Sequence, residues 1–161
     1  MKRSAVFSAD RRYRYELWRV WGDERNFVNF ICLNPSTADE QTDDQTIRKC
    51  IKFAKSWGYE ALCVTNLFAW RSTDRRVLRT EIDPIGREND FVIERIAAEA
   101  AIVIAAWSQD GNLHDRSLWV RRLIKRPIHI LKMGKKEPQH PLYLPDATQP
   151  VEWNELPEVK S

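Results

Sequence analysis

The sequence predicts an α/β fold, a three-layer α/β/α sandwich whose central, mainly parallel sheet has about four strands and is extended by an N-terminal β-hairpin. The first observation behind this is that short apolar segments alternate along the chain with segments of helical periodicity. The second is size, because 161 residues with 43% hydrophobic side chains suffice for one domain with its own core. We expect a hairpin over 1–25, an α/β core over 26–133 and a proline-rich, irregular tail over 134–161.

The N-terminal hairpin is predicted over residues 4–21, with a polar turn at 8–12, because apolar and polar side chains alternate from Tyr13 onward. The next segment, 27–33, is mostly apolar and stops at Asn34-Pro35. This is expected of a buried strand, since proline cannot continue the hydrogen-bond ladder.

An amphipathic helix is predicted from Asp44 onward, because apolar residues recur at three- and four-residue steps up to Trp57. Gly58 stands where a C-terminal cap belongs. Later elements are predicted as strands over 61–68, 100–107 and 128–133 and as helices over 88–98 and 115–125. Strands alternating with helices are typical of a parallel sheet with helices on both faces.

The formal net charge of +3 is too small to indicate a binding partner on its own. Basic residues gather in clusters, interleaved with aromatic residues, at 11–14, 71–79, 121–126 and 132–136. Such clusters are typical of surfaces that follow a phosphate backbone, and also of ordinary solvated faces. The expected partner is nucleic acid or a nucleotide, with both interpretations of the clusters open.

Cysteine usage and hydropathy bear on the compartment. Cys32, Cys50 and Cys63 are widely spaced inside apolar segments, so we expect buried thiols and neither a disulfide nor a thiolate metal site. The longest uncharged apolar run, 100–107, is far shorter than the roughly 20 residues of a membrane helix. The N-terminal residues lack the apolar core of a signal peptide. These observations predict a cytoplasmic protein with no membrane partner.

Candidate site residues follow the predicted parallel strands, because ligands of open α/β sheets bind beyond the carboxyl ends of the strands. The candidates are Asn34, Pro35 and Ser36 after the first strand, Asn66, Phe68, Trp70 and Arg71 after the second, Trp107 after the third, and His140 in the tail. The chain has no glycine-rich nucleotide loop, GxSxG elbow or HExxH motif. Dinucleotide oxidoreductases, NTPases, serine hydrolases and zincins are therefore disfavoured, and no cofactor is expected.

Each candidate also has a purely structural interpretation. Asn34 before Pro35 is typical of a turn and also fits an active site. Asn66 ends an apolar strand, where its amide needs partners from a ligand or from neighbouring backbone. For Phe68 and Trp70 we favour packing over base stacking. His140 lies in a polar tail, so it is the strongest candidate for stabilising negative charge.

An acidic stretch offers a different chemistry. Asp39, Asp43 and Asp44 carry oxygen ligands that suit a divalent cation. Aspartates at the start of a helix more often cap it and complement its dipole. We therefore favour capping for Asp43 and Asp44 and predict no metal.

Several motifs resemble those of an uncharacterised bacterial and phage domain family, in the same order and over about residues 4–145. They are LNPSTAD at 33–39, DQTIR at 44–48, WGY at 57–59, TNLFA at 65–69, GREND at 86–90 and HPLYLP at 140–145. This resemblance implies membership of that family, to which no activity is attached.

A more distant resemblance is to the uracil-DNA glycosylase superfamily, through Asn34-Pro35, Asn66 with the arginines that follow it, and His140-Pro141. It implies a glycosylase-like fold in which Asn34 positions the attacking water, Asn66 reads the base edge and His140 stabilises the departing base. The sequence departs from the pattern at three places. Cys32 replaces the motif glycine, Leu142 replaces a phosphate-contacting serine, and Asn34 lacks the basicity of an aspartate.

The sequence thus favours a glycosylase-like protein that acts on or binds a base in nucleic acid or a nucleotide, with hydrolysis of an N-glycosidic bond as the enzymatic form. Two alternatives stay open. One is a non-catalytic nucleic-acid or nucleotide-binding module. The other is a metal-dependent hydrolase that uses Asp39, Asp43 and Asp44.

Overall fold

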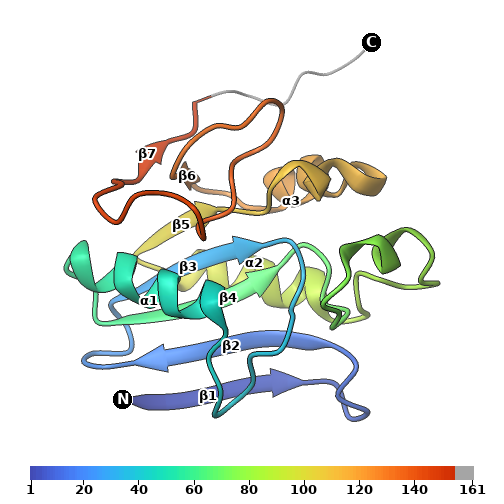
Figure 1. Ribbon diagram of the computed structural model, residues 1–161, viewed down its shortest axis with the longest axis horizontal. Helices are drawn as coiled ribbons and strands as arrows, with labels where there is room; N and C mark the ends of the chain where they lie inside the picture. The colour runs from blue at the N-terminus through green and yellow to red at the C-terminus, as the bar shows by residue number, and fades with distance from the viewer. Residues whose placement is uncertain (155–161) are drawn as a thin grey trace.

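A mixed sheet of seven strands forms the centre of the computed structural model, which describes residues 1–154 (Figure 1). The strand order is β1-β2-β4-β3-β5-β6-β7. The strands are β1 (Lys2–Phe7), β2 (Arg14–Val20), β3 (Phe27–Cys32), β4 (Ala61–Asn66), β5 (Ile102–Ala105), β6 (His129–Ile130) and β7 (Val151–Glu152). Strands β4, β3, β5 and β6 pair in parallel, and β1, β2 and β7 pair antiparallel. The predicted α/β class is confirmed, with a mixed sheet.

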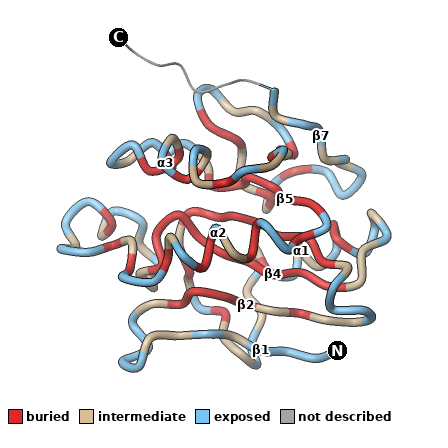
Figure 2. Tube along the Cα trace, turned by 180° about the vertical axis from the view of Figure 1, so that it is seen from behind, coloured by how far each residue is buried: buried red, intermediate tan, exposed pale blue. Residues whose placement is uncertain are grey.

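Helices cover both faces of this sheet (Figure 1). The described residues form the α-helices α1 (Gln45–Ser56), α2 (Asn89–Glu99) and α3 (Arg116–Leu123) and the 3-10 helices η1 (Arg75–Arg79) and η2 (Gln109–Asp115). Helix α1 packs against Phe30 and Val64, and α2 and α3 pack on the opposite face against Ile31 and Val103. Successive strand residues point to opposite faces of the sheet. Because helices cover both of these faces, the residues of β3 and β4 are buried whichever face they point to, and most of them are apolar (Figure 2).

Helix α1 begins and ends where its sequence pattern predicts. The Asp44 carboxylate accepts the backbone N–H of Ile47 at 2.9 Å and so caps the first turn. Ile47 and Phe53 are buried against the sheet. Gly58 follows the helix with φ of +86°, the left-handed conformation that glycine adopts without a steric penalty. The capping role expected of Asp44 is confirmed.

The tail differs from the prediction. The strand expected over 128–133 is reduced to the short β6, and β7 adds to it from the segment expected to be irregular. The Trp153 N–H donates to Ile128 O at 2.8 Å beside this pair. A two-residue strand after a proline carries no periodicity, so the sequence pattern could not reveal it. Residues 155–161 of the predicted tail lie outside the described residues.

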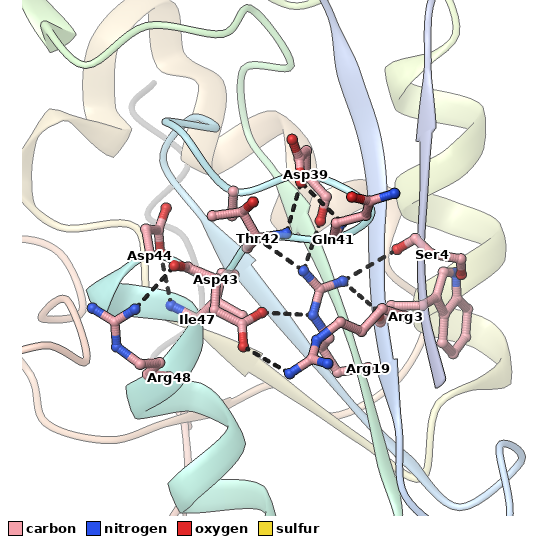
Figure 3. A network of polar contacts seen from close by, with 12 residues as sticks. Arg3, Ser4, Arg19, Asp39, Gln41, Thr42, Asp43, Asp44, Ile47 and Arg48 are labelled. Carbon is pink, nitrogen blue, oxygen red and sulfur yellow. Dashed lines mark hydrogen bonds and ion pairs between the residues drawn. The ribbon is translucent and has the colours of Figure 1, made fainter. Parts of the chain in front are cut away.

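The polar interior holds a second correction. Arg19 has a fully buried side chain, and its Nε donates to an Asp43 carboxylate oxygen at 2.7 Å (Figure 3). Its Nη2 donates to the carbonyl oxygens of Asp39 and Thr42 at 2.6 and 3.2 Å. Arg3 lies 3.6 Å from the same Asp43 carboxylate. Asp43 therefore pairs with arginines of the hairpin and does not cap α1, because Asp44 already occupies the capping position.

The cysteine prediction agrees with the structure. Cys32, Cys50 and Cys63 are all free and buried. Burial raises the pKa of the Cys63 thiol well above its ordinary value, which keeps it protonated and unreactive at neutral pH.

Candidate functional site

A cavity of about 800 Å³ lies at the edge of the sheet where β3 and β4 end. It receives side chains from the loops that follow these strands, from the start of α1 and from the tail. The sequence-predicted residues in its lining are Asn34, Ser36, Asn66 and His140. The structure thus brings together polar groups that are more than 100 positions apart in the chain. The volume is in the range of pockets that take small organic ligands.

Asn66 is the last residue of β4 and is 1% exposed. Within residues 1–154, neither its side-chain Nδ2 nor its Oδ1 has a hydrogen-bond partner. Burying such a group without a partner costs about 1–3 kcal/mol per donor or acceptor. Asn66 is one of the residues that line the cavity, and both of its amide atoms are buried beneath that lining. It is therefore a donor and an acceptor that the protein leaves for something else to satisfy.

Asn34 is tied into the loops around the cavity. Its Nδ2 donates to Pro35 O at 3.1 Å and to Ser72 O at 2.9 Å. The Ser72 N–H donates in return to Pro35 O at 2.9 Å. The amide nitrogen is thus used to join the two loops, and the side-chain oxygen has no donor among residues 1–154. The structural and the functional interpretation of Asn34 are compatible.

His140 is held by its own turn. The Leu142 N–H donates to His140 Nδ1 at 3.2 Å. A ring nitrogen that accepts carries no proton, so the proton of the neutral ring lies on Nε2. Burial lowers the pKa of His140 below its ordinary value, which favours this neutral form at pH 7. His140 is accordingly a hydrogen-bond donor at the cavity.

Two predicted residues lie in the core and not in the cavity lining. Phe68 and Trp107 are both 0% exposed. Trp107 donates from Nε1 to a Glu137 carboxylate oxygen at 2.9 Å, and Ser117 donates from Oγ to the other oxygen at 2.6 Å. This buried cluster fixes the loop after β5 to the tail segment that leads to His140. Both aromatic residues follow strands, where position alone does not reveal which side chains turn inward.

The remaining candidates also lie outside the lining. The Trp70 ring packs edge-on against Tyr13, with ring centroids 5.3 Å apart. The Arg71 guanidinium lies 4.7 Å above the centre of the Phe7 ring. The Pro35 carbonyl oxygen accepts the Ser72 N–H and so joins the two loops beside the cavity. These residues therefore support the surrounding loops, which are the walls of the cavity.

The buried contact of Trp107 leads to a stability prediction. Trp107→Phe keeps an aromatic ring, although a smaller one, and removes a donor from the buried Glu137 carboxylate, so we expect the free energy of unfolding to fall by at least about 1–3 kcal/mol. Urea unfolding measures this change. Trp119→Phe is the matched control, because the Trp119 bond to Asp90 is exposed, and it is expected to cost less than about 1 kcal/mol. Equal effects of the two substitutions would contradict the buried contact.

The acidic stretch has structural partners. Asp39 accepts the backbone N–H groups of Gln41 and Thr42 at 2.9 and 2.7 Å, and these bonds lower the pKa of its carboxyl group. Asp43 pairs with Arg19 and Asp44 caps α1 (Figure 3). Over residues 1–154, no group of three or more His, Cys, Asp or Glu side chains is placed to hold a metal ion. Of the three aspartates, only Asp44 lines the cavity.

The sequence-predicted site lacked several lining residues, and two of them stand out. Arg14 of β2 is 2% exposed, although its place in an alternating strand is typical of a solvent-facing position. Ser108, after β5, has φ of +68° and ψ of −177°, a conformation otherwise almost confined to glycine. The basic cluster at 11–14 was a signal for Arg14, but no local pattern shows that a loop folds over it.

The fold and the cavity define an α/β domain with a ligand-sized hollow at the carboxyl ends of its parallel strands, a place typical of ligand sites in this class. The chain belongs to the family described as "Protein of unknown function (DUF1643)", which matches residues 14–142. The match includes every lining residue named above. The searches of curated proteins and of solved structures gave no match. In the part of the chain that the structure describes, no helix is long and apolar enough to span a membrane.

Proposed function

We propose that the protein binds a nucleobase-bearing ligand, a nucleotide or an extruded nucleotide of a nucleic acid, with Asn66 reading the edge of the base. The observation that carries the proposal is that Asn66 lines the cavity with a buried amide that has no hydrogen-bond partner among residues 1–154. An amide offers a donor and an acceptor side by side, which match the adjacent acceptor and donor on the edge of a base. Tyr143, which is 90% exposed in the same lining, offers a ring on which a base can stack.

The same residues suit hydrolysis of an N-glycosidic bond. In this reaction the bond between the sugar C1′ and the base nitrogen breaks, water oxygen attaches to C1′, and the base leaves with the bonding electrons. The side-chain oxygen of Asn34 would hold the water, and the Nε2 proton of His140 would stabilise the negative charge on the departing base. Asp44 would accept the proton of the water, a role that the amide of Asn34 cannot fill.

Asp44 suits this role better than the other acidic side chain of the lining. Both carboxylate oxygens of Asp74 are bonded to the Arg76 guanidinium. Asp44 uses one oxygen to accept the Ile47 N–H. Its second oxygen therefore remains for a water in the cavity.

The proposal is tested by measuring base release from a panel of nucleosides, nucleotides and modified single-stranded oligonucleotides, followed by chromatography. We expect release by the wild type that falls by about 100-fold or more in Asn66→Ala and in Asp44→Asn, which keeps the helix cap. Binding without release that still depends on Asn66 would assign a non-catalytic binding module. If the wild type neither binds nor releases a base from any member of the panel, the proposed function is contradicted.

A further inference from the structure

Two arginines of β2 are buried, and their surroundings differ sharply. Arg19 and Arg14 are 0% and 2% exposed. Arg19 has a carboxylate partner, Asp43, and several carbonyl acceptors (Figure 3). The Arg14 side chain has one hydrogen bond among residues 1–154, from Nη1 to Ala38 O at 3.0 Å, and no carboxylate within ion-pair distance there. Its Nε is buried without a partner in that same part of the chain.

A buried guanidinium without a counter-ion is costly, because its charge has lost water and gained no anion. The cost is visible in Arg14 itself, since burial lowers its pKa to about 10. The structural duty of this side chain, one bond to a loop carbonyl, needs no positive charge. The positive charge of Arg14 at this buried position is explained if an anionic group of a ligand binds to it.

Arg14 and Asn66 belong to neighbouring strands. In the antiparallel pair of β2 and β4, Leu17 is opposite Val64, so Arg14 stands just beyond the end of β4, which Asn66 forms. Both residues line the same cavity. A ligand with an amide-like edge and an anionic group therefore meets an unsatisfied partner for each.

The neighbouring charges leave Arg14 available. Asp44 acts on it electrostatically, but its side chain accepts the N–H of Ile47 and does not form an ion pair with Arg14. Arg75 and Arg76, also in the lining, already lie 3.0 Å from the carboxylates of Asp110 and Asp74. Arg14 is thus the buried cation of the cavity whose charge is least compensated by the described residues.

We propose that Arg14 forms a subsite for a phosphate group, so that the ligand of this cavity is a nucleotide and not a free nucleobase. The planar guanidinium with its forked donors matches phosphate oxygens in a bidentate manner. The Thr46 and Ser36 side chains in the same lining add hydroxyl donors. The base half of this statement rests on the proposed function, whereas the phosphate half rests on Arg14 alone.

The test compares a nucleoside, its 5′-monophosphate, inorganic phosphate and a short single-stranded oligonucleotide by calorimetry. For the wild type we expect the monophosphate to bind about 10- to 100-fold more tightly than the nucleoside. Arg14→Met is expected to abolish this preference, and Arg14→Lys to keep part of it. Preference for the oligonucleotide over the monophosphate would identify the phosphate as that of a polynucleotide backbone; the reverse would identify a free nucleotide.

Thermal unfolding of the ligand-free variants separates a binding role from a structural one. Arg14→Met is expected to melt at or above the wild-type temperature, because it removes an uncompensated buried charge. Arg19→Met, on the same strand, is expected to melt well below it. A phosphate preference that persists in Arg14→Met, with or without a lower melting temperature, would overturn the subsite.

The variants also distinguish this inference from the proposed function. Loss of the phosphate preference in Arg14→Met with no effect of Asn66→Leu on nucleotide affinity would keep the phosphate subsite and contradict base reading. If Asn66→Leu weakens nucleotide binding and Arg14→Met keeps the phosphate preference, base reading is supported and the phosphate subsite is contradicted.

Discussion

Arg19→Met is expected to lower the free energy of unfolding by about 3–5 kcal/mol, because it removes the buried partner of the Asp43 carboxylate. The Asp43 oxygen lies 2.7 Å from Arg19 Nε, and the Arg19 side chain has no exposed surface. The substitution also removes the donors that Arg19 gives to the Asp39 and Thr42 carbonyl oxygens. The loop that leads into α1 therefore loses the bonds that Arg19 gives it and keeps the Arg14 bond to Ala38 O.

Urea unfolding with wild type and variant under the same conditions measures this change, provided that the dependence on urea stays the same. Arg3→Met is the matched control, since Arg3 lies 3.6 Å from the same carboxylate but its side chain is 42% exposed. Such an exposed pair is worth at most about 1 kcal/mol. A loss of less than about 1 kcal/mol in Arg19→Met would show that the network does not hold the loop.

Asn66→Leu is expected to raise the free energy of unfolding by about 1–3 kcal/mol and to weaken nucleotide binding by about 10-fold or more. The gain has a simple cause, because leucine has the same branching and number of non-hydrogen atoms as asparagine and removes a buried donor and acceptor that lack partners among the described residues. The loss of affinity follows from the same change, since the base edge loses both of its partners. A stabilising substitution that harms function is typical of a binding site.

Asn89→Leu provides the contrast. Asn89 is also fully buried, but its Nδ2 donates to Asn66 O at 2.9 Å and to Leu67 O at 3.1 Å. Its replacement leaves these carbonyl groups with fewer donors, so the free energy of unfolding is expected to fall. Destabilisation by Asn66→Leu comparable to that of Asn89→Leu would mean that the Asn66 amide is structural.

The sequence predicted the parts of the site that depend on local patterns. The helical period from Ile47 to Trp57 and the glycine after it placed α1 and its cap. The rule that ligands bind at the carboxyl ends of parallel strands placed Asn34 and Asn66 together, and the polar setting of His140 marked the tail. These inferences need only the periodicity and the order of the elements.

The rest depends on contacts between distant segments. Arg14 lies in an alternating strand, yet it is buried and its Nη1 donates to Ala38 O in a loop more than 20 positions further along the chain. Trp107 lies just after β5, and Asn66 is the last residue of β4, but the Trp107 ring turns into the core to reach Glu137. Strand alternation gives two faces and does not say which of them a loop or a tail will cover.

A crystal structure with a bound nucleoside 5′-monophosphate tests the base-reading role of Asn66 most directly. We predict that the base edge lies within about 3.2 Å of both Nδ2 and Oδ1 of Asn66. Because these atoms are buried in the ligand-free protein, side chains of the lining must shift to admit the base. A nucleotide bound elsewhere, or an Asn66 amide that remains covered while the ligand fills the cavity, would contradict the account.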